Sequence, residues 1–218
     1  MATDRDVGIV GLGKFGMALA EYLLEQGHTI LGVDRGEARV KAAQDLLDQV
    51  FRADATDQAA LAQLGFGDLR QVIVCVGQSM EASILATLHL KELGVESVWV
   101  KAVSDEHERV LEKLGADYVV FPERFVAKQL AHKLTVPGLV HSLPLSKGVV
   151  MQEIRVENWS GKTLRELDLP NSHQLRVVAL QRKGEGEFDY LPFADMMLGL
   201  GDIIVAVGDQ EAMKKIEP

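Results

Sequence analysis

The sequence predicts an α/β fold in which a Rossmann-type doubly wound parallel sheet is followed by a small α+β C-terminal domain. Short apolar runs alternate with helical patterns over the first 121 residues, and a glycine-rich turn follows the first run. Continuous apolar strands joined by helices are typical of a parallel sheet with helices on both faces. Beyond residue 148 strand patterns dominate. We therefore expect a Rossmann nucleotide-binding domain with a crossover helix over 1–135 and a small ligand or dimerisation domain over 145–218.

Hydrophobic periodicity defines the elements of the first domain. Its six strands are expected at Val7–Val10, Thr29–Val33, Gln49–Arg52, Gln71–Val76, Ser97–Ala102 and Tyr118–Phe121. Four amphipathic stretches between these strands are expected to be helices, at Phe15–Glu25, Glu37–Leu47, Met80–Leu93 and Asp105–Leu114. Gly27 and Gly94 each follow a helical stretch, and glycine at that position is a common way for a helix to end.

The crossover helix is expected over Glu123–Leu134 and to end before Pro137, because proline disfavours helix at the residue that precedes it. Its apolar stripe comprises Phe125, Val126, Leu130 and Leu134. The stripe either packs on its own domain or crosses to a second subunit, and both alternatives remain open. In the second domain, strands are expected at Val149–Val156, Leu175–Arg182, Glu187–Leu191 and Asp202–Gly208, with helices at Thr163–Leu167 and Gln210–Ile216.

The composition argues against nucleic-acid binding, an intrachain disulfide and a membrane-spanning helix. The 218 residues carry a formal charge of −9, and we find no basic patch, so binding to nucleic acid is not expected. A single cysteine, Cys75, excludes an intrachain disulfide and fits a reducing cytosol. No window approaches the roughly 20 uninterrupted apolar residues of a membrane helix. Any action at a membrane is therefore expected to need a partner.

A glycine motif marks the predicted nucleotide site. Gly11-Leu-Gly13-Lys-Phe-Gly16 follows an apolar strand and precedes a helix, which is the context that supports a dinucleotide-binding turn. Gly11 permits the tight turn, Gly13 lets the backbone approach a pyrophosphate, and Gly16 allows close helix–strand packing. The phosphates would meet the free N–H groups at the start of the helix near Phe15.

Polar residues follow the neighbouring strands. Asp34 ends the second strand, where an acid accepts hydrogen bonds from the adenosine ribose and repels a 2′-phosphate. Arg35 could recruit NADP, although stacking or solvation is favoured beside Asp34. Further candidates are Asp54, Ala55 and Thr56 after the third strand, where Asp54 and Thr56 either face the adenosine or cap the next helix. Gly77 and Ser79, after the fourth strand, are expected near phosphate or ribose, and Lys14 either meets a terminal phosphate or is solvated.

No catalytic constellation accompanies the predicted cofactor. The Tyr-x-x-x-Lys pair of short-chain dehydrogenases is absent, and Cys75 lies within a predicted buried strand. A nucleotide site without an evident acid–base pair indicates sensing rather than turnover, so we expect no enzyme. The main alternative is an NAD-dependent oxidoreductase of unknown substrate. A redox-sensing transcription regulator would need a basic DNA-reading module, for which neither terminus has the charge.

Several segments resemble the family of regulators of potassium conductance, which includes the Ktr- and Trk-type regulatory subunits of potassium uptake systems. They include Ile9–Gly16, Gly32–Asp34, Ala53–Thr56, Val98–Lys101, Val110–Asp117 and Phe121–Glu123, and the resemblance extends over nearly the whole chain. The first domain resembles the family's N-terminal nucleotide domain. The second resembles its C-terminal ligand domain, through Gly161–Leu164 and Leu200–Val205.

The resemblance implies a cytoplasmic ring of dimers, an octamer, held at the inner face of the membrane by an integral-membrane potassium pore subunit. It implies ATP, ADP or NAD(H) in the Rossmann cleft, with Lys14 near the γ-phosphate and Lys101 near the phosphates. Glu123 matches a position near an intersubunit cation, which suits Mg²⁺ or Ca²⁺ beside ATP; alternatively it is a carboxylate at the start of a helix, where the macrodipole favours it. Some relatives bind cyclic di-AMP in the second domain, but Arg165 and Pro170 look altered here and argue against that ligand.

Overall fold

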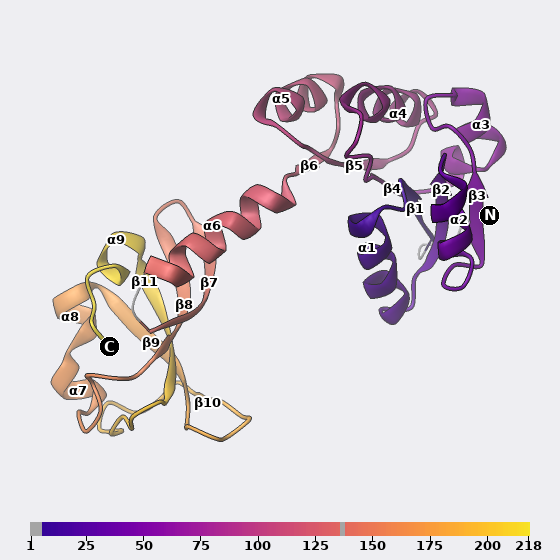
Figure 1. The fold of residues 1–218 in the computed structure, drawn as a ribbon. Helices are drawn as coiled ribbons and strands as arrows, with labels where there is room; N and C mark the ends of the chain where they lie inside the picture. Colours follow the sequence, from indigo (N-terminus) through magenta and orange to yellow (C-terminus); the bar gives the residue numbers. More distant parts are fainter. Residues whose placement is uncertain (1–5, 136–137) are drawn as a thin grey trace. The chain divides into compact units, whose positions relative to one another are not determined.

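A parallel sheet of six strands organises the first part of the chain (Figure 1). The structure is a computed structural model that describes residues 6–135 and 138–218. The strand order is β3-β2-β1-β4-β5-β6, which confirms the predicted Rossmann-type topology. The strands are β1 (Asp6–Val10), β2 (Thr29–Asp34), β3 (Gln49–Arg52), β4 (Gln71–Val74), β5 (Ser97–Lys101) and β6 (Tyr118–Val120).

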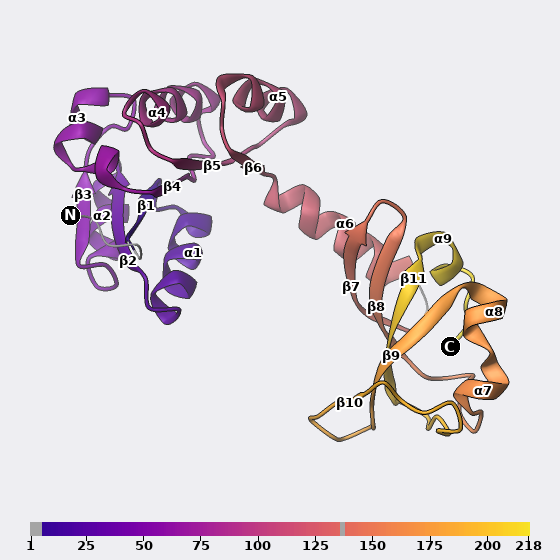
Figure 2. The same cartoon turned by 180° about the vertical axis from the view of Figure 1, so that it is seen from behind.

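Helices cover both faces of this sheet, as expected of a doubly wound fold. Ile9 and the residues that share its face of the sheet form one core with α1 (Lys14–Glu25) and α2 (Glu37–Ala43). Val10 and its neighbours form a second core on the opposite face. Figures 1 and 2 show the helices of that opposite face side by side: α3 (Gln58–Gln63), α4 (Met80–Glu92) and α5 (Asp105–Leu114).

Most differences from the predicted elements in this part are short. The helix α3 and the 3₁₀ turn η1 (Phe66–Asp68) were not expected, because six and three residues are too few to display a helical period. The helix α2 ends at Ala43 rather than Leu47, and β4 ends at Val74 rather than Val76. Phe66 is nevertheless fully buried, so η1 contributes to the core.

The chain divides into two compact units, Met1–Pro122 and Glu123–Pro218. The helix α6 (Pro122–Thr135) falls almost wholly in the second unit by this division. Pro137, from which the end of this helix was predicted, lies outside the described residues. All four apolar residues of the predicted stripe on α6 are exposed, Leu134 most of all at 85%.

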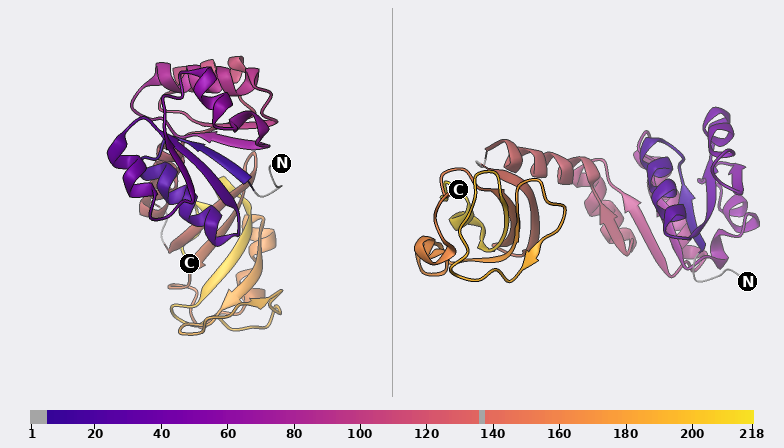
Figure 3. Two further views of the ribbon diagram at one scale, coloured as in Figure 1. Left: turned by 90° about the vertical axis from the view of Figure 1, so that its right-hand side faces the viewer. Right: turned by 90° about the horizontal axis from the view of Figure 1, so that it is seen from below.

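An antiparallel sheet of five strands forms the body of the second unit (Figure 3), in the order β10-β9-β11-β8-β7. One face packs against short helices, and the core that lies between them includes Trp159 and Ile204. The elements are β7 (Leu139–Ser146), β8 (Val149–Arg155), α7 (Leu164–Leu167), α8 (Leu169–His173), β9 (Leu175–Gln181), β10 (Asp189–Tyr190), β11 (Ile203–Asp209) and α9 (Gln210–Met213).

Two of these elements, β7 and α8, were not expected from the sequence. The strand β7 lies at an edge of the sheet and contains Pro144, and proline is tolerated in strands mainly at edges. The strand β10 and helix α9 are shorter than predicted. Over the described parts of the chain, no helix has both the length and the apolar character needed to span a bilayer.

Candidate functional site

The glycine turn between β1 and α1 has the geometry that its motif predicts. Gly11 has a φ of +96°, and a Cβ there would lie 3.1 Å from backbone atoms of Cys75 and Val76. A Cβ on Gly16 would lie 2.1 Å from the carbonyl oxygen of Gly11, so the helix and the turn touch. A Cβ on Gly13 would meet nothing within 4 Å. The turn is therefore closed at Gly11 and Gly16 and open at Gly13.

The start of α1 faces this open position. Gly13 is the N-cap residue and supplies no side-chain hydrogen bond, so the helix's first N–H groups keep the capacity to bind a ligand. A twelve-residue helix also carries a partial positive charge at this end. Lys14, the first helical residue, is exposed, and Phe15 is half-buried. The arrangement can receive an anion such as a phosphate.

Asp34 lies beside the turn, at the end of β2. Its side chain is only 3% exposed, and the carboxylate accepts three hydrogen bonds. The backbone N–H groups of Leu12 and Gly36 donate to it at 2.8 and 2.7 Å, and Arg39 Nη1 lies 3.3 Å from Oδ2. Asp34 thus ties the glycine turn to the segment that follows β2, in addition to its predicted role at the ribose.

Arg39 is a residue of this site that was not predicted from the sequence. It lies on α2, and its side chain is 41% exposed. The separation of five residues from Asp34 carries no signal by itself, since only the turn of the chain through Gly36 brings α2 back against the end of β2. Arg35, which the sequence did single out, is exposed and does not contact Asp34 in any hydrogen bond of the described structure.

The loop after β3 is organised around Asp54. Its Oδ1 accepts hydrogen bonds from the Thr56 N–H at 2.9 Å and from the Thr56 hydroxyl at 2.8 Å. These bonds, aided by the charge of Arg35, lower the pKa of the Asp54 carboxyl. The residue that caps α3 is Asp57, which corrects the capping alternative for Asp54 and Thr56. Ala55 is half-buried and packs against the core below the loop.

A positively charged side chain, Lys101, lies at the same edge of the sheet, where β4 and β5 end. Lys101 Nζ lies 5.5 Å from the centroid of the Phe15 ring, and 3.9 Å from where a Cβ on Gly77 would be. Burial raises the pKa of the Cys75 thiol to about 12, although the nearby charge of Lys101 acts against this rise. Ser79 is the N-cap of α4, where its hydroxyl accepts a hydrogen bond from Ala82 N–H.

Glu123 was the predicted metal ligand. It is exposed in the first turn of α6 and belongs to the second unit. Among residues 6–135 and 138–218, no three His, Cys, Asp or Glu side chains gather closely enough to hold a metal ion. A cation at Glu123 would therefore need further oxygen ligands from water, from a phosphate or from another chain.

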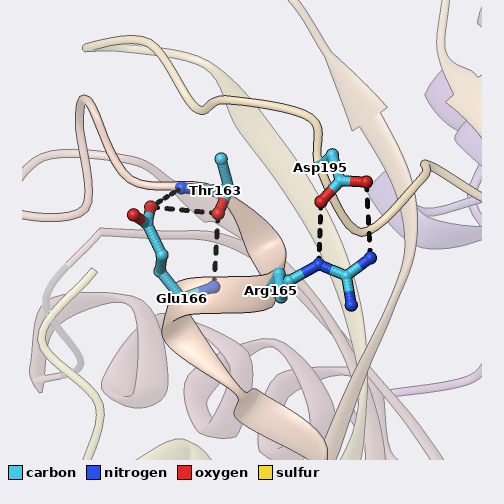
Figure 4. Close-up of polar contacts among 4 residues, drawn as sticks. All are labelled: Thr163, Arg165, Glu166 and Asp195. Carbon is cyan, nitrogen blue, oxygen red and sulfur yellow. Dashed lines mark hydrogen bonds and ion pairs between the residues drawn. The ribbon is translucent and has the colours of Figure 1, made fainter.

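The second unit presents two exposed polar groupings near the start of α7 (Figure 4). Thr163 and Glu166 form a capping box, in which each side chain bonds the backbone N–H of the other residue. Arg165 forms a two-point ion pair with Asp195, through Nε at 2.8 Å and Nη2 at 3.3 Å. Arg165, one of the two residues that argue against a cyclic di-AMP site, is therefore already paired with a carboxylate of the same unit.

The fold and the open turn define a two-domain protein with a Rossmann-type N-terminal domain. Residues 7–122 match the TrkA-N domain, and residues 151–218 match the TrkA-C domain. The chain is 36% identical over 211 residues to Ktr system potassium uptake protein A of Vibrio alginolyticus, which covers 96% of this chain and 95% of the relative. It is 34% identical over 214 residues to Ktr system potassium uptake protein C of Bacillus subtilis (strain 168), covering 98% and 96%. The chain therefore belongs to the Ktr potassium uptake protein family.

Solved structures share the fold. The GsuK channel bound to NAD superposes with a TM-score of 0.54 at 24% identity, over 98% of this chain and 38% of that chain. GsuK bound to ADP superposes with a TM-score of 0.52 at 28% identity, over 60% of this chain and 34% of that one. The chain thus spans little more than a third of the GsuK polypeptide.

Proposed function

We propose that this chain is a nucleotide-sensing regulatory subunit that gates a membrane potassium transporter or channel. The observation that carries the proposal is the convergence of an open glycine turn, a ribose-side acid and a cation at one sheet edge, in a Ktr family chain. Gly13, Asp34 and Lys101 come from three different strand ends to that edge. The carboxyl edge of the sheet, beside the strand where the order reverses, is where doubly wound folds bind their ligands.

The proposed ligands are ATP, ADP or NAD(H). Their phosphates would lie against Gly13 and the start of α1, with Lys14 and Lys101 as cationic partners and Gly77 leaving room beside Lys101. Phe15 would pack near the phosphates and Asp34 would bind the ribose. Likeness to GsuK bound to ADP, at 28% identity over 60% of this chain, supports an adenine nucleotide here.

We infer regulation rather than turnover. The thiol of Cys75 has a pKa of about 12, and His107 is fully buried, so neither group is suited to proton transfer at neutral pH. A sensor needs unequal binding of two nucleotides to two conformations. ATP and ADP differ by one phosphoryl group, and Lys14 together with a Mg²⁺ or Ca²⁺ ion at Glu123 would respond to that difference.

The proposed assembly is a homo-oligomer, built from dimers into a ring beneath an integral-membrane potassium pore subunit at the cytoplasmic face. The exposed stripe on α6, comprising Phe125, Val126, Leu130 and Leu134, supports subunit contacts through that helix. Contiguous exposed apolar surface commonly marks a protein interface. In a closed ring, small conformational changes at each nucleotide cleft add up and can act on an attached pore.

Native mass spectrometry of the purified protein tests this proposal by reporting copy number and co-purified nucleotide together. We expect an even-numbered oligomer larger than a dimer, with a bound adenine nucleotide. Potassium flux through the reconstituted pore should then differ between ATP and ADP. A strict monomer at high concentration with both nucleotides, or a flux that ignores this protein in every nucleotide state, would refute the proposal.

A further inference from the structure

The acid at the ribose end of the proposed site is neither exposed nor uncompensated. An acid at this position normally selects against a 2′-phosphate through charge repulsion. The Asp34 side chain is 3% exposed, and two backbone N–H groups and one guanidinium already bind its two oxygens. Such a carboxylate repels an approaching anion less than a free one, because the two N–H dipoles and the nearby guanidinium partly offset its charge.

The neighbouring charges are balanced in the same way. Glu37 is ion-paired with Arg52, at 2.7 Å between Oε2 and Nη1. The carboxylate of Asp54 is held by Thr56, and the positive charge of Arg35 acts on it. Asp34, Glu37 and Asp54 thus each lie near an arginine, so the charges of these six residues offset one another within a chain of net charge −9.

The hydrogen-bonding capacity of the Asp34 carboxylate is also largely used within the protein. An ionised carboxylate has about four acceptor positions. Leu12 N–H and Arg39 occupy those of Oδ2, and Gly36 N–H occupies one of Oδ1, so about one position remains for the two hydroxyls of a ribose. Arg39, in contrast, carries five N–H donors, and only one of them is used on Asp34.

We propose that the ribose end of this site accepts 2′-phosphorylated adenosine ligands, the class that includes NADP(H), beside their unphosphorylated counterparts. Arg39 binds the 2′-phosphate through its planar guanidinium, and Arg35, exposed at the next position after Asp34, adds a second positive charge. This inference rests on the proposed function, because it takes the nucleotide cleft as the binding site.

Isothermal titration calorimetry with AMP and adenosine 2′,5′-bisphosphate isolates the effect, since these ligands differ only in the 2′-phosphate. We expect the unaltered protein to bind the two with dissociation constants within about tenfold of each other. Arg39→Gln should raise the ratio of the bisphosphate constant to the AMP constant by about 10- to 100-fold, the range for losing a charge-assisted hydrogen bond. Lys41→Gln removes the same charge from an exposed position of the same helix and should leave the ratio unchanged.

Arg35→Gln provides a second variant, because its exposed side chain is not a partner of Asp34 and its loss should not disturb the fold. It should raise the same ratio by a smaller factor. Binding of AMP together with a bisphosphate constant more than 100-fold weaker would overturn this inference and leave the proposed function intact. An unchanged ratio in both arginine variants would also overturn it. If neither AMP nor ADP binds the unaltered protein, the proposed function itself fails.

Discussion

Replacing Asp34 with alanine should destabilise the first domain even when no nucleotide is added. The substitution removes the acceptor of two backbone N–H groups, at 2.8 and 2.7 Å, and the ion-pair partner of Arg39. The amide of Leu12 lies in the glycine turn, and Leu12 itself is only 2% exposed, so water cannot readily replace the lost acceptor.

The expected loss follows from these contacts. Each hydrogen bond to a charged group contributes roughly 1.5–3 kcal/mol. The bond from Leu12 is buried and the bond from Gly36 is part-buried, so together they contribute about 3–5 kcal/mol. The Arg39 contact adds little, since that side chain is 41% exposed and well screened by water. We therefore expect Asp34→Ala to lower the free energy of unfolding by about 3–5 kcal/mol.

Urea unfolding followed by circular dichroism measures this loss. Asp57→Ala is the matched control, because Asp57 also accepts two backbone N–H bonds but is exposed at the start of α3. It should cost only about 1 kcal/mol, as other helix caps do. A loss below about 1 kcal/mol for Asp34→Ala would mean that the carboxylate does not hold the glycine turn, and the account of this site would be wrong.

Three further predictions concern the turn, pH and the cation. Gly16→Ala should disrupt the first domain, because its Cβ would lie 2.1 Å from the Gly11 oxygen. Gly13→Ala, with open space around it, should lower the melting temperature only slightly, as a poorer helix cap, and weaken ADP binding by about tenfold. Equal losses of melting temperature in the two variants would contradict this contrast. Burial lowers the pKa of His107 below its ordinary 6.5, so its neutral form is favoured in the folded state. The resulting stability is complete above pH 6.5 and is lost as pH falls toward the lower folded-state pKa. The urea concentration at the unfolding midpoint should therefore decrease as pH is lowered from about 7 to about 5.5, and it should decrease less in His107→Asn. Parallel decreases in the two proteins would refute the assignment to His107. Glu123→Gln should reduce the thermal stabilisation by Mg-ATP but not that by ADP alone, whereas equal loss with both ligands would indicate only a charge effect at the start of α6.

The glycine turn and the parallel sheet could be predicted from the sequence because their signals are local. Buried strands such as Val7–Val10 are continuous apolar runs, and the spacing of Gly11, Gly13 and Gly16 reflects sterics within one turn. The convergence of strand ends on one edge follows from parallel topology alone. Lys101, in contrast, was expected near the phosphates only from the family resemblance, and its closeness to Phe15 and Gly77 was not predicted.

The partners of Asp34 could not be predicted, because they depend on how the chain turns after β2. Whether Arg35 or Arg39 reaches the carboxylate is decided by the direction in which α2 begins, which no short pattern specifies. The edge strand β7 was missed for a related reason: strands with Pro144 and bulged pairing lose the regular alternation that identifies a strand. Short elements such as α3 give too few residues for any period to emerge.

Each compact unit has its own core, and each contains one of the two tryptophans of the chain. Trp99 is stacked on Tyr118 in the first unit, and Trp159 is buried in the core of the second. Replacing either by phenylalanine would leave a fluorophore that reports on a single unit. A ligand stabilises the unit to which it binds, so a nucleotide should shift the Trp99 transition. Any accompanying shift at Trp159 would measure, as a free energy, how strongly the state of one domain is transmitted to the other.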